Sequence, residues 1–109
     1  MSTTQEYDFE LGANGTLLDV HLSVPKFDAA RVPVFQAQLE EAWENSIERV
    51  RIFMGDVAFI DSSGIGALLA VQKKIAEVNA AIELHTSQSN VISILELLRL
   101  QRGFHIMSE

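Results

Sequence analysis

Strand-like and helix-like patterns alternate along this chain of 109 residues, and the alternation limits the folds open to it. The strand-like runs are Tyr7–Leu11, Thr16–Val24, Arg49–Met54 with Val57–Ile60 as a short continuation, Ala81–His85 and Phe104–Met107. Helical periodicity follows the second, third and fourth of these runs, so the predicted order is β-β-α-β-α-β-α-β. Strands that alternate with helices predict an α/β fold, in which a small mixed β-sheet packs with about three to four α-helices.

Signals in the first half of the chain place individual turns and one helix start. Asn14-Gly15 predicts a tight hairpin turn between the first two strands, and Leu18–Val24 alternates apolar and polar residues, as a strand with one wet face does. Pro25–Val32 is predicted to be irregular. Pro33 suits the first turn of a helix, because the N–H that proline lacks has no partner there. The apolar stripe of this amphipathic helix is Phe35, Leu39, Ala42 and Trp43.

The second half predicts two more helices. In the first, Gln72 interrupts an apolar face that otherwise consists of Ile65, Leu68, Leu69, Ile75 and Ala76. The apolar face of the second consists of Val91, Ile94, Leu95 and Leu98. Ser89 or Asn90 is the expected cap of this last helix. With so few helices, one face of the sheet is expected to carry most of them.

Composition narrows the class of protein. The length fits a single domain over residues 1–109, and the net charge of −7 argues against nucleic-acid binding, which needs a basic face. The chain has no cysteine, and its three histidines (His21, His85 and His105) lack the spacing of metal ligands, so no metal or cofactor is expected. No apolar run approaches the roughly 20 residues of a membrane span, and residues 1–6 lack the features of a signal peptide. We therefore expect a cytoplasmic protein without membrane insertion.

The segment Phe59–Gly66 is the candidate functional element. An apolar strand ends at Ile60 and a helix begins within about three residues, so the first N–H groups of that helix lack partners. Ser62 or Ser63 could cap them with a hydroxyl oxygen, and the two glycines of the segment let an outside group approach the backbone. An ordinary helix cap and a binding site both stay open on these residues alone. The carboxyl end of a strand is, however, where α/β sheets tend to place their sites.

Phosphorylation of a serine in this segment would be physically favourable. The phosphoryl group would add about −1.5 to −2 charge near the positive end of a helix dipole, and its oxygens could accept the free N–H groups directly. Asp61 would repel the added charge, so we expect the phosphoserine to point away from that carboxylate. The changed surface charge would make or break a protein contact without unfolding the domain.

The stretch Val57–Leu68 resembles the signature of STAS domains of the bacterial anti-sigma factor antagonist type. In that family an apolar strand is followed by Asp-Ser-Ser/Thr-Gly-Leu/Ile-Gly and an apolar helix. The resemblance spans most of the chain and implies the STAS fold, with residues 1–109 as a single STAS domain. Outside the signature, the similar residues are Asp28, Pro33, Phe35 and Leu39 in a loop and first helix, and Leu100 and Phe104 in the last helix and closing strand.

The resemblance implies partner switching and no enzymatic activity. An unphosphorylated antagonist of this type binds an anti-sigma factor that is also a serine protein kinase of the histidine-kinase-like ATPase type, and so releases its client. The kinase then phosphorylates the antagonist, which ends the complex, and a serine phosphatase of the metal-dependent type resets it. By the motif, Ser62 is the phosphorylation site and Ser63 the neighbouring helix cap. The implied partner-binding residues are Asp28, Asp61, Ser62, Ser63, Gly64 and Gly66.

Three segments depart from the family pattern. Val24–Asp28 replaces Gly-Glu-Leu/Ile-Asp and keeps only the Asp, Ala80-Ala81 replaces Gly-Gly, and Leu98–Leu100 replaces Thr-Gly-Leu. These departures affect the identity of the partner more than the fold.

Other functions fit this sequence less well. STAS domains also serve as scaffold subunits of stressosome-type assemblies and as accessory subunits of lipid transporters, but the transporter subunits commonly lose the serine pair that this chain keeps. A catalytic serine is disfavoured because Asp61–Gly64 does not read Gly-x-Ser-x-Gly. We interpret Trp43 as packing. The residues interpreted as the solvated side of a helix are Glu40, Glu41 and Glu44.

Overall fold

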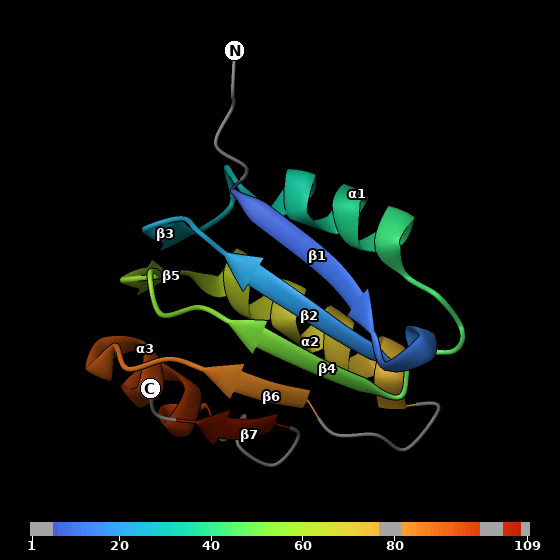
Figure 1. Cartoon of the computed structure of the whole chain (residues 1–109). Helices are drawn as coiled ribbons and strands as arrows, with labels where there is room; N and C mark the ends of the chain where they lie inside the picture. Colours follow the sequence, from blue (N-terminus) through green and yellow to red (C-terminus); the bar gives the residue numbers. More distant parts are fainter. Residues whose placement is uncertain (1–5, 77–81, 99–103, 108–109) are drawn as a thin grey trace.

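The main sheet has five strands in the order β1-β2-β4-β6-β7 (Figure 1). The computed structural model describes residues 6–76, 82–98 and 104–107. The strands of this sheet are β1 (Tyr7–Gly12), β2 (Leu17–Leu22), β4 (Arg49–Phe53), β6 (Ile82–His85) and β7 (Phe104–Met107). The helices are α1 (Val32–Ala42), α2 (Ser62–Ala76) and α3 (Ser89–Leu97). The predicted α/β fold with a mixed sheet is confirmed, since β1 runs antiparallel to β2 while the other pairs are parallel.

β1 and β2 form the predicted hairpin. Gly12 pairs with Leu17, so the connecting loop consists of Ala13–Thr16. The three residues of Ala13–Gly15 adopt positive φ angles of 50°, 61° and 86°. Asparagine and glycine tolerate this left-handed conformation better than other residues do. Asn14-Gly15 thus marks the turn correctly, although the loop is longer than a two-residue turn.

A second, small sheet pairs β3 (Lys26–Phe27) with β5 (Phe59–Ile60) in parallel. The sequence predicts an irregular stretch at Pro25–Val32. This prediction is wrong for Lys26–Phe27, which form β3. The sequence also predicts Val57–Ile60 as a continuation of β4, whereas the chain turns at Gly55-Asp56 and leaves the main sheet. Strands of two residues show no measurable periodicity, so the sequence pattern carries no signal for their pairing.

One face of the main sheet carries the helices and the core. Strand residues on this face, such as Val20, Ile52 and Leu84, are fully buried. In Figure 1, α2 crosses behind β2 and β4. The expectation that one sheet face carries most of the helices is therefore confirmed. The side chains that the three helices contribute to the same core are Val32, Phe35, Leu39, Ile65, Ala67, Leu68, Val71, Ile75, Val91 and Leu95.

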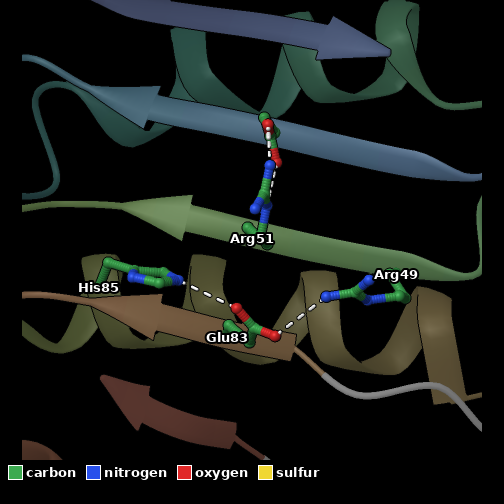
Figure 2. Close-up of polar contacts among 5 residues, drawn as sticks. Arg49, Arg51, Glu83 and His85 are labelled. Atoms are coloured by element: carbon green, nitrogen blue, oxygen red, sulfur yellow. Dashed lines mark hydrogen bonds and ion pairs between the residues drawn. The ribbon is translucent and has the colours of Figure 1, made fainter. Parts of the chain in front are cut away.

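The opposite face of the sheet points away from the helices and is polar (Figure 2). Arg51 of β4 donates to both carboxylate oxygens of Asp19 on β2, at 2.7 Å from Nε and 2.6 Å from Nη2. Glu83 of β6 contacts the Arg49 guanidinium at 3.2 Å and His85 Nε2 at 3.0 Å. Charged side chains on neighbouring strands therefore pair across this face instead of packing against a second layer.

Two histidines belong to an aromatic stack on the same polar face. The Phe53 ring lies between His21 and His85, with centroid distances of 4.7 and 4.6 Å. Within the described ranges, no three His, Asp or Glu side chains are placed to hold a metal ion. Over the same residues, no helix combines the length and the apolar character needed to cross a bilayer.

Candidate functional site

Asp61 directly precedes α2, and its carboxylate makes two contacts with backbone N–H groups. Oδ1 accepts a hydrogen bond from Gly64 at 3.0 Å, and Oδ2 accepts one from Ala29 at 3.1 Å. The Gly64 contact is that of a helix N-cap residue, which satisfies an N–H group without a partner inside the helix. These donors, Gly64 foremost, lower the pKa of the Asp61 carboxyl from its ordinary value. The carboxylate is therefore held as an anion between α2 and the loop after β3.

The two serines occupy the first two positions of α2, which begins at Ser62. Ser62 is exposed and Ser63 is half-buried. The prediction that Ser63 caps the helix is wrong, because a cap residue precedes the helix and Asp61 holds that position and makes the capping bond. Capping therefore requires neither serine hydroxyl, and the Ser62 side chain lies open to solvent.

The two glycines of the turn have different surroundings. A Cβ at Gly64 would lie 2.3 Å from the Phe27 carbonyl oxygen and 2.7 Å from Ile60 Cγ1. Gly64 is therefore needed for the close approach of β3 to α2, so the expectation that it leaves room for an outside group is wrong. A Cβ at Gly66 would meet nothing within 4 Å, and Gly66 is exposed. Only Gly66 of this pair leaves the helix surface bare.

Asp28 lies in the loop between β3 and α1, next to a residue that contacts Asp61. Its Oδ1 pairs with Arg31 Nη1 at 3.4 Å, and its carbonyl accepts the backbone N–H groups of Arg31 and Val32 at 3.0 and 2.9 Å. These bonds shape the loop into a turn, while the N–H of Ala29 donates to Asp61. The structure thus brings the loop of Asp28 and the turn of Asp61 together.

Tyr7 of β1 anchors the same loop, and the sequence analysis missed this contact. Its hydroxyl donates to the Arg31 carbonyl at 3.0 Å, and its ring meets Phe27 and Phe35 edge-on, with centroids 6.2 and 5.5 Å away. Burial, with a smaller effect of the Glu6 carboxylate, raises the pKa of the Tyr7 hydroxyl to about 12. Nothing in the strand pattern distinguishes Tyr7, because its partner lies 24 positions along the chain.

An exposed stripe runs along α2 and starts at the candidate phosphorylation site. Leu69 is 38 % exposed, so the prediction that it joins the inward apolar face is wrong. Phe59, on β5 just before the turn, is 48 % exposed. Apolar surface therefore accompanies Ser62 on the outside of the domain. The stripe consists of Ser62, Gly66, Leu69 and Lys73, whose spacing places them on one helix face.

A side chain of α3 contacts the segment that leads into β5. Gln88 is the N-cap residue of α3 and makes no side-chain cap bond, so the expectation that Ser89 or Asn90 caps this helix is wrong. Both residues lie inside the first turn, and the Asn90 amide donates to the Ala58 carbonyl instead. This contact fixes α3 beside the segment that carries Asp61.

The acidic residues near the end of α1 face solvent. Glu41 and Glu44 are exposed, and Glu40 accepts a hydrogen bond from Lys74 of α2 at 2.9 Å. Trp43 packs against the core, with the Lys74 ammonium 5.5 Å from its ring centroid. The interpretation of these residues as a solvated helix side and a packing side chain is confirmed.

The sequence model of the STAS domain matches residues 9–109. The chain belongs to the STAS domain family. Phe104 is the buried first residue of β7, as the family pattern implies, whereas Ala80-Ala81 and Leu100 lie outside the described residues. No curated protein matches the chain significantly.

This STAS domain is similar to solved structures of anti-sigma factor antagonists. SpoIIAA in its unphosphorylated form superposes with a TM-score of 0.76 at 17 % identity, over 94 % of this chain and 89 % of that one. A Thermotoga maritima protein described as a candidate anti-sigma factor antagonist gives 0.76 at 19 % identity, over 94 % and 86 %. The Bacillus cell fate determinant SpoIIAA in the phosphorylated form gives 0.71 at 16 % identity, over 94 % and 92 %. At such identities the likeness shows the shared fold.

Proposed function

We propose that this STAS domain is a partner-switching regulator of the anti-sigma factor antagonist kind. Its unphosphorylated form binds an anti-sigma factor that is also a serine kinase of the histidine-kinase-like ATPase type, and binding releases the client of that factor. Phosphorylation of Ser62 ends the complex, and a metal-dependent serine phosphatase restores the binding form. The observation that carries this proposal is the exposed Ser62 at the first position of α2, beside an Asp61 carboxylate fixed by two backbone bonds.

A phosphoryl group on Ser62 would act at the surface of the domain. The Asp61 carboxylate accepts the N–H of Gly64, so one of the donors at the start of α2 already faces an anion. Phosphoryl oxygens on Ser62 are expected to accept the N–H groups that Asp61 leaves open. Repulsion from Asp61 directs the phosphoryl group outward, where its charge of about −1.5 to −2 faces a docked partner.

The docking face that this function requires lies around Ser62. Gly66, one turn further along α2, is exposed and presents bare backbone. Leu69 and Phe59 add exposed apolar surface, whose removal from water favours association. A partner that covers these residues would also cover Ser62. A phosphoryl group on Ser62 would then lose its hydration without gaining a counter-charge, and this cost would end the complex.

Incubation with ATP and the cognate serine kinase, followed by mass spectrometry of the phosphopeptides, tests the acceptor. We expect one phosphate, on Ser62, in the native chain and none in Ser62→Ala. Ser63→Ala is the matched control, because it removes the adjacent hydroxyl and keeps Ser62, so it should be labelled like the native chain. Labelling that persists in Ser62→Ala and disappears in Ser63→Ala would show that the assignment of the acceptor is wrong.

Two further measurements separate this function from other roles of STAS domains. A stressosome-type scaffold subunit would elute from a sizing column as a large complex, and a subunit of a lipid transporter would copurify with a membrane ATPase. The proposed cytoplasmic switch should do neither. It should bind a soluble kinase tightly only while Ser62 is unphosphorylated.

A further inference from the structure

β1 is an edge strand of the main sheet, and half of its backbone groups point away from β2. The Ser23 N–H donates to the Glu6 carbonyl at 2.7 Å, which makes these two residues a hydrogen-bonded pair next to β1. Because such pairs alternate along antiparallel strands, the backbone groups of Tyr7, Phe9 and Leu11 point outward. These outward N–H and C=O groups are a template for pairing with another extended segment.

A groove accompanies this edge, with which no described strand other than β2 pairs. It measures about 400 Å³ and lies between β1 and α1. Figure 1 shows α1 alongside β1 at the edge of the sheet. The Phe9 ring lies 5.7 Å from that of Phe35 on α1, measured between centroids, so the two elements are held together beneath the groove. The residues that line it are Tyr7, Asp8 and Phe9 from β1, and Gln38, Glu41 and Ala42 from α1.

The charge around the groove has one sign. Glu41 lines the groove from α1, and the exposed side chains of Glu6, Asp8 and Glu10 border the same edge of β1 on the polar face of the sheet. Neither β1 nor α1 contains a lysine or arginine within its bounds. A segment that carries lysine or arginine would therefore be attracted to this groove, and an acidic segment would be repelled.

We propose that the groove between β1 and α1 binds an extended, basic segment of a partner protein by strand addition. The segment pairs with the outward backbone groups of Tyr7, Phe9 and Leu11, and alternate side chains enter the groove toward α1. The basic side chains of the segment lie over the polar sheet face beside Asp8 and Glu10, which pair with His21 and Asp19 of that face, and Glu41 attracts the segment from the α1 side of the groove. Main-chain bonds of this kind supply affinity, and the carboxylates on both sides of the edge supply the preference for a basic sequence.

A second copy of this chain does not satisfy the same requirements. Pairing of two β1 edges would bring together two strands that each carry Glu6, Asp8 and Glu10, and like charges on paired strands are destabilising. Acidic side chains on an edge also protect a protein from pairing with itself. The occupant favoured by the charge is therefore a heterologous basic segment.

The probe for this site is a synthetic peptide of alternating lysine and valine, about seven residues long to match a strand of ordinary length. The matched peptide replaces each lysine with glutamate. With saturating lysine peptide, amide hydrogen exchange followed by NMR should slow by about tenfold or more at Tyr7, Phe9 and Leu11. Exchange at Asp8 and Glu10, whose N–H groups already point to β2, should change little.

Two substitutions test the two parts of the mechanism. Leu11→Pro removes an outward N–H that β2 does not use, and proline is tolerated at such edge positions, so the variant should fold and lose most of the peptide affinity. Glu41→Lys reverses a lining charge on exposed helix surface and should weaken binding by about fivefold. Glu96→Lys makes the same change on α3 and should leave the affinity unchanged. The amide NMR spectrum of each variant reports whether it is folded.

Several results would overturn the proposal. These are unchanged exchange at the three outward amides, equal binding of the glutamate peptide, or equal effects of Glu41→Lys and Glu96→Lys. A dimer of the free chain that Leu11→Pro dissolves would assign the edge to a second copy instead. Ser62→Asp should leave peptide affinity unchanged, because Ser62 is not part of the groove. A failure of the proposed phosphorylation would therefore be distinguishable from a failure of this inference.

Discussion

The carboxylate of Asp61 accepts a hydrogen bond from the backbone N–H of Ala29 at 3.1 Å, across 32 positions of sequence. The same side chain caps α2 through Gly64. One residue therefore joins the loop that contains Asp28 to the turn that contains Ser62. The candidate docking surface is thus built from two segments that this carboxylate joins, in addition to the pairing of β3 with β5.

Replacing Asp61 should loosen this junction. Asp61→Asn keeps the size of the side chain but removes the charge, so the variant should melt at a lower temperature than the native chain at neutral pH. The folded-state pKa of Asp61 is lowered, so its contribution is present at neutral pH and is lost as the pH falls below about 3.8 through the folded-state value. Urea unfolding of both proteins between neutral and acidic pH tests this. A stability difference that does not shrink on acidification would contradict the assignment.

The two glycines of the turn should respond oppositely to alanine. Gly64→Ala places a Cβ 2.3 Å from a backbone carbonyl oxygen and should cost about 1–3 kcal/mol or more of unfolding free energy. Gly66→Ala enters open space inside a helix and should stabilise the domain by roughly 0.5–1 kcal/mol. Urea titrations of the two variants provide the comparison. Equal effects at the two positions would disprove the close approach at Gly64.

Under the proposed function, a charge at Ser62 should weaken the complex with the proposed anti-sigma partner. Ser62→Asp should raise the Kd about tenfold or more, which corresponds to about 1.4 kcal/mol of like-charge and desolvation cost. Ser62→Ala removes only an exposed hydroxyl and should bind like the native chain. Isothermal titration calorimetry with the isolated partner measures both. If the two variants bind with the same Kd, the proposed switch is wrong.

The two ion pairs of the polar sheet face should differ in strength. Arg51 binds both oxygens of Asp19, and their side chains are 34 % and 19 % exposed, whereas Arg49 beside Glu83 is 59 % exposed (Figure 2). Double-mutant cycles with alanine should give a coupling of about 1 kcal/mol for the first pair and roughly 0.3 kcal/mol for the second. The Arg51 guanidinium carbon also lies 5.6 Å from the Phe53 ring centroid. Phe53→Leu is therefore the control that measures the contribution of this cation–π contact. Equal coupling free energies would show that the bidentate geometry of the Arg51–Asp19 pair adds no stability on this face.

The regular elements were predictable because their periodic patterns extend over several turns or strand positions. Leu18–Val24 and Arg49–Met54 alternate clearly and became β2 and β4, and Pro33 marked the start of α1. β3 and β5 have two residues each, so no pattern could reveal them. Their pairing depends on the tertiary approach of distant segments.

The candidate site was predictable in position but not in the assignment of its parts. Aspartate and serine are equally good cap residues. The choice between Asp61 and Ser63 would therefore have required the position of the helix start to be known to within one residue. The need for glycine at Gly64 arises from the Phe27 carbonyl, which no local pattern indicates. The spacing of Leu69 matches the apolar face of α2. Its side chain lies at the margin of that face, however, where solvent reaches it.

The close approach of Gly64 to the Phe27 carbonyl has a consequence for how fast the proposed regulator can respond. Together with the two bonds of Asp61, it locks β3, the Asp28 loop and the start of α2 into one unit. Under the proposed function, a phosphoryl group on Ser62 changes the surface charge of this rigid unit and requires no rearrangement of the chain. The response time of such a regulator is then set by the turnover of its kinase and phosphatase, without a slow structural step.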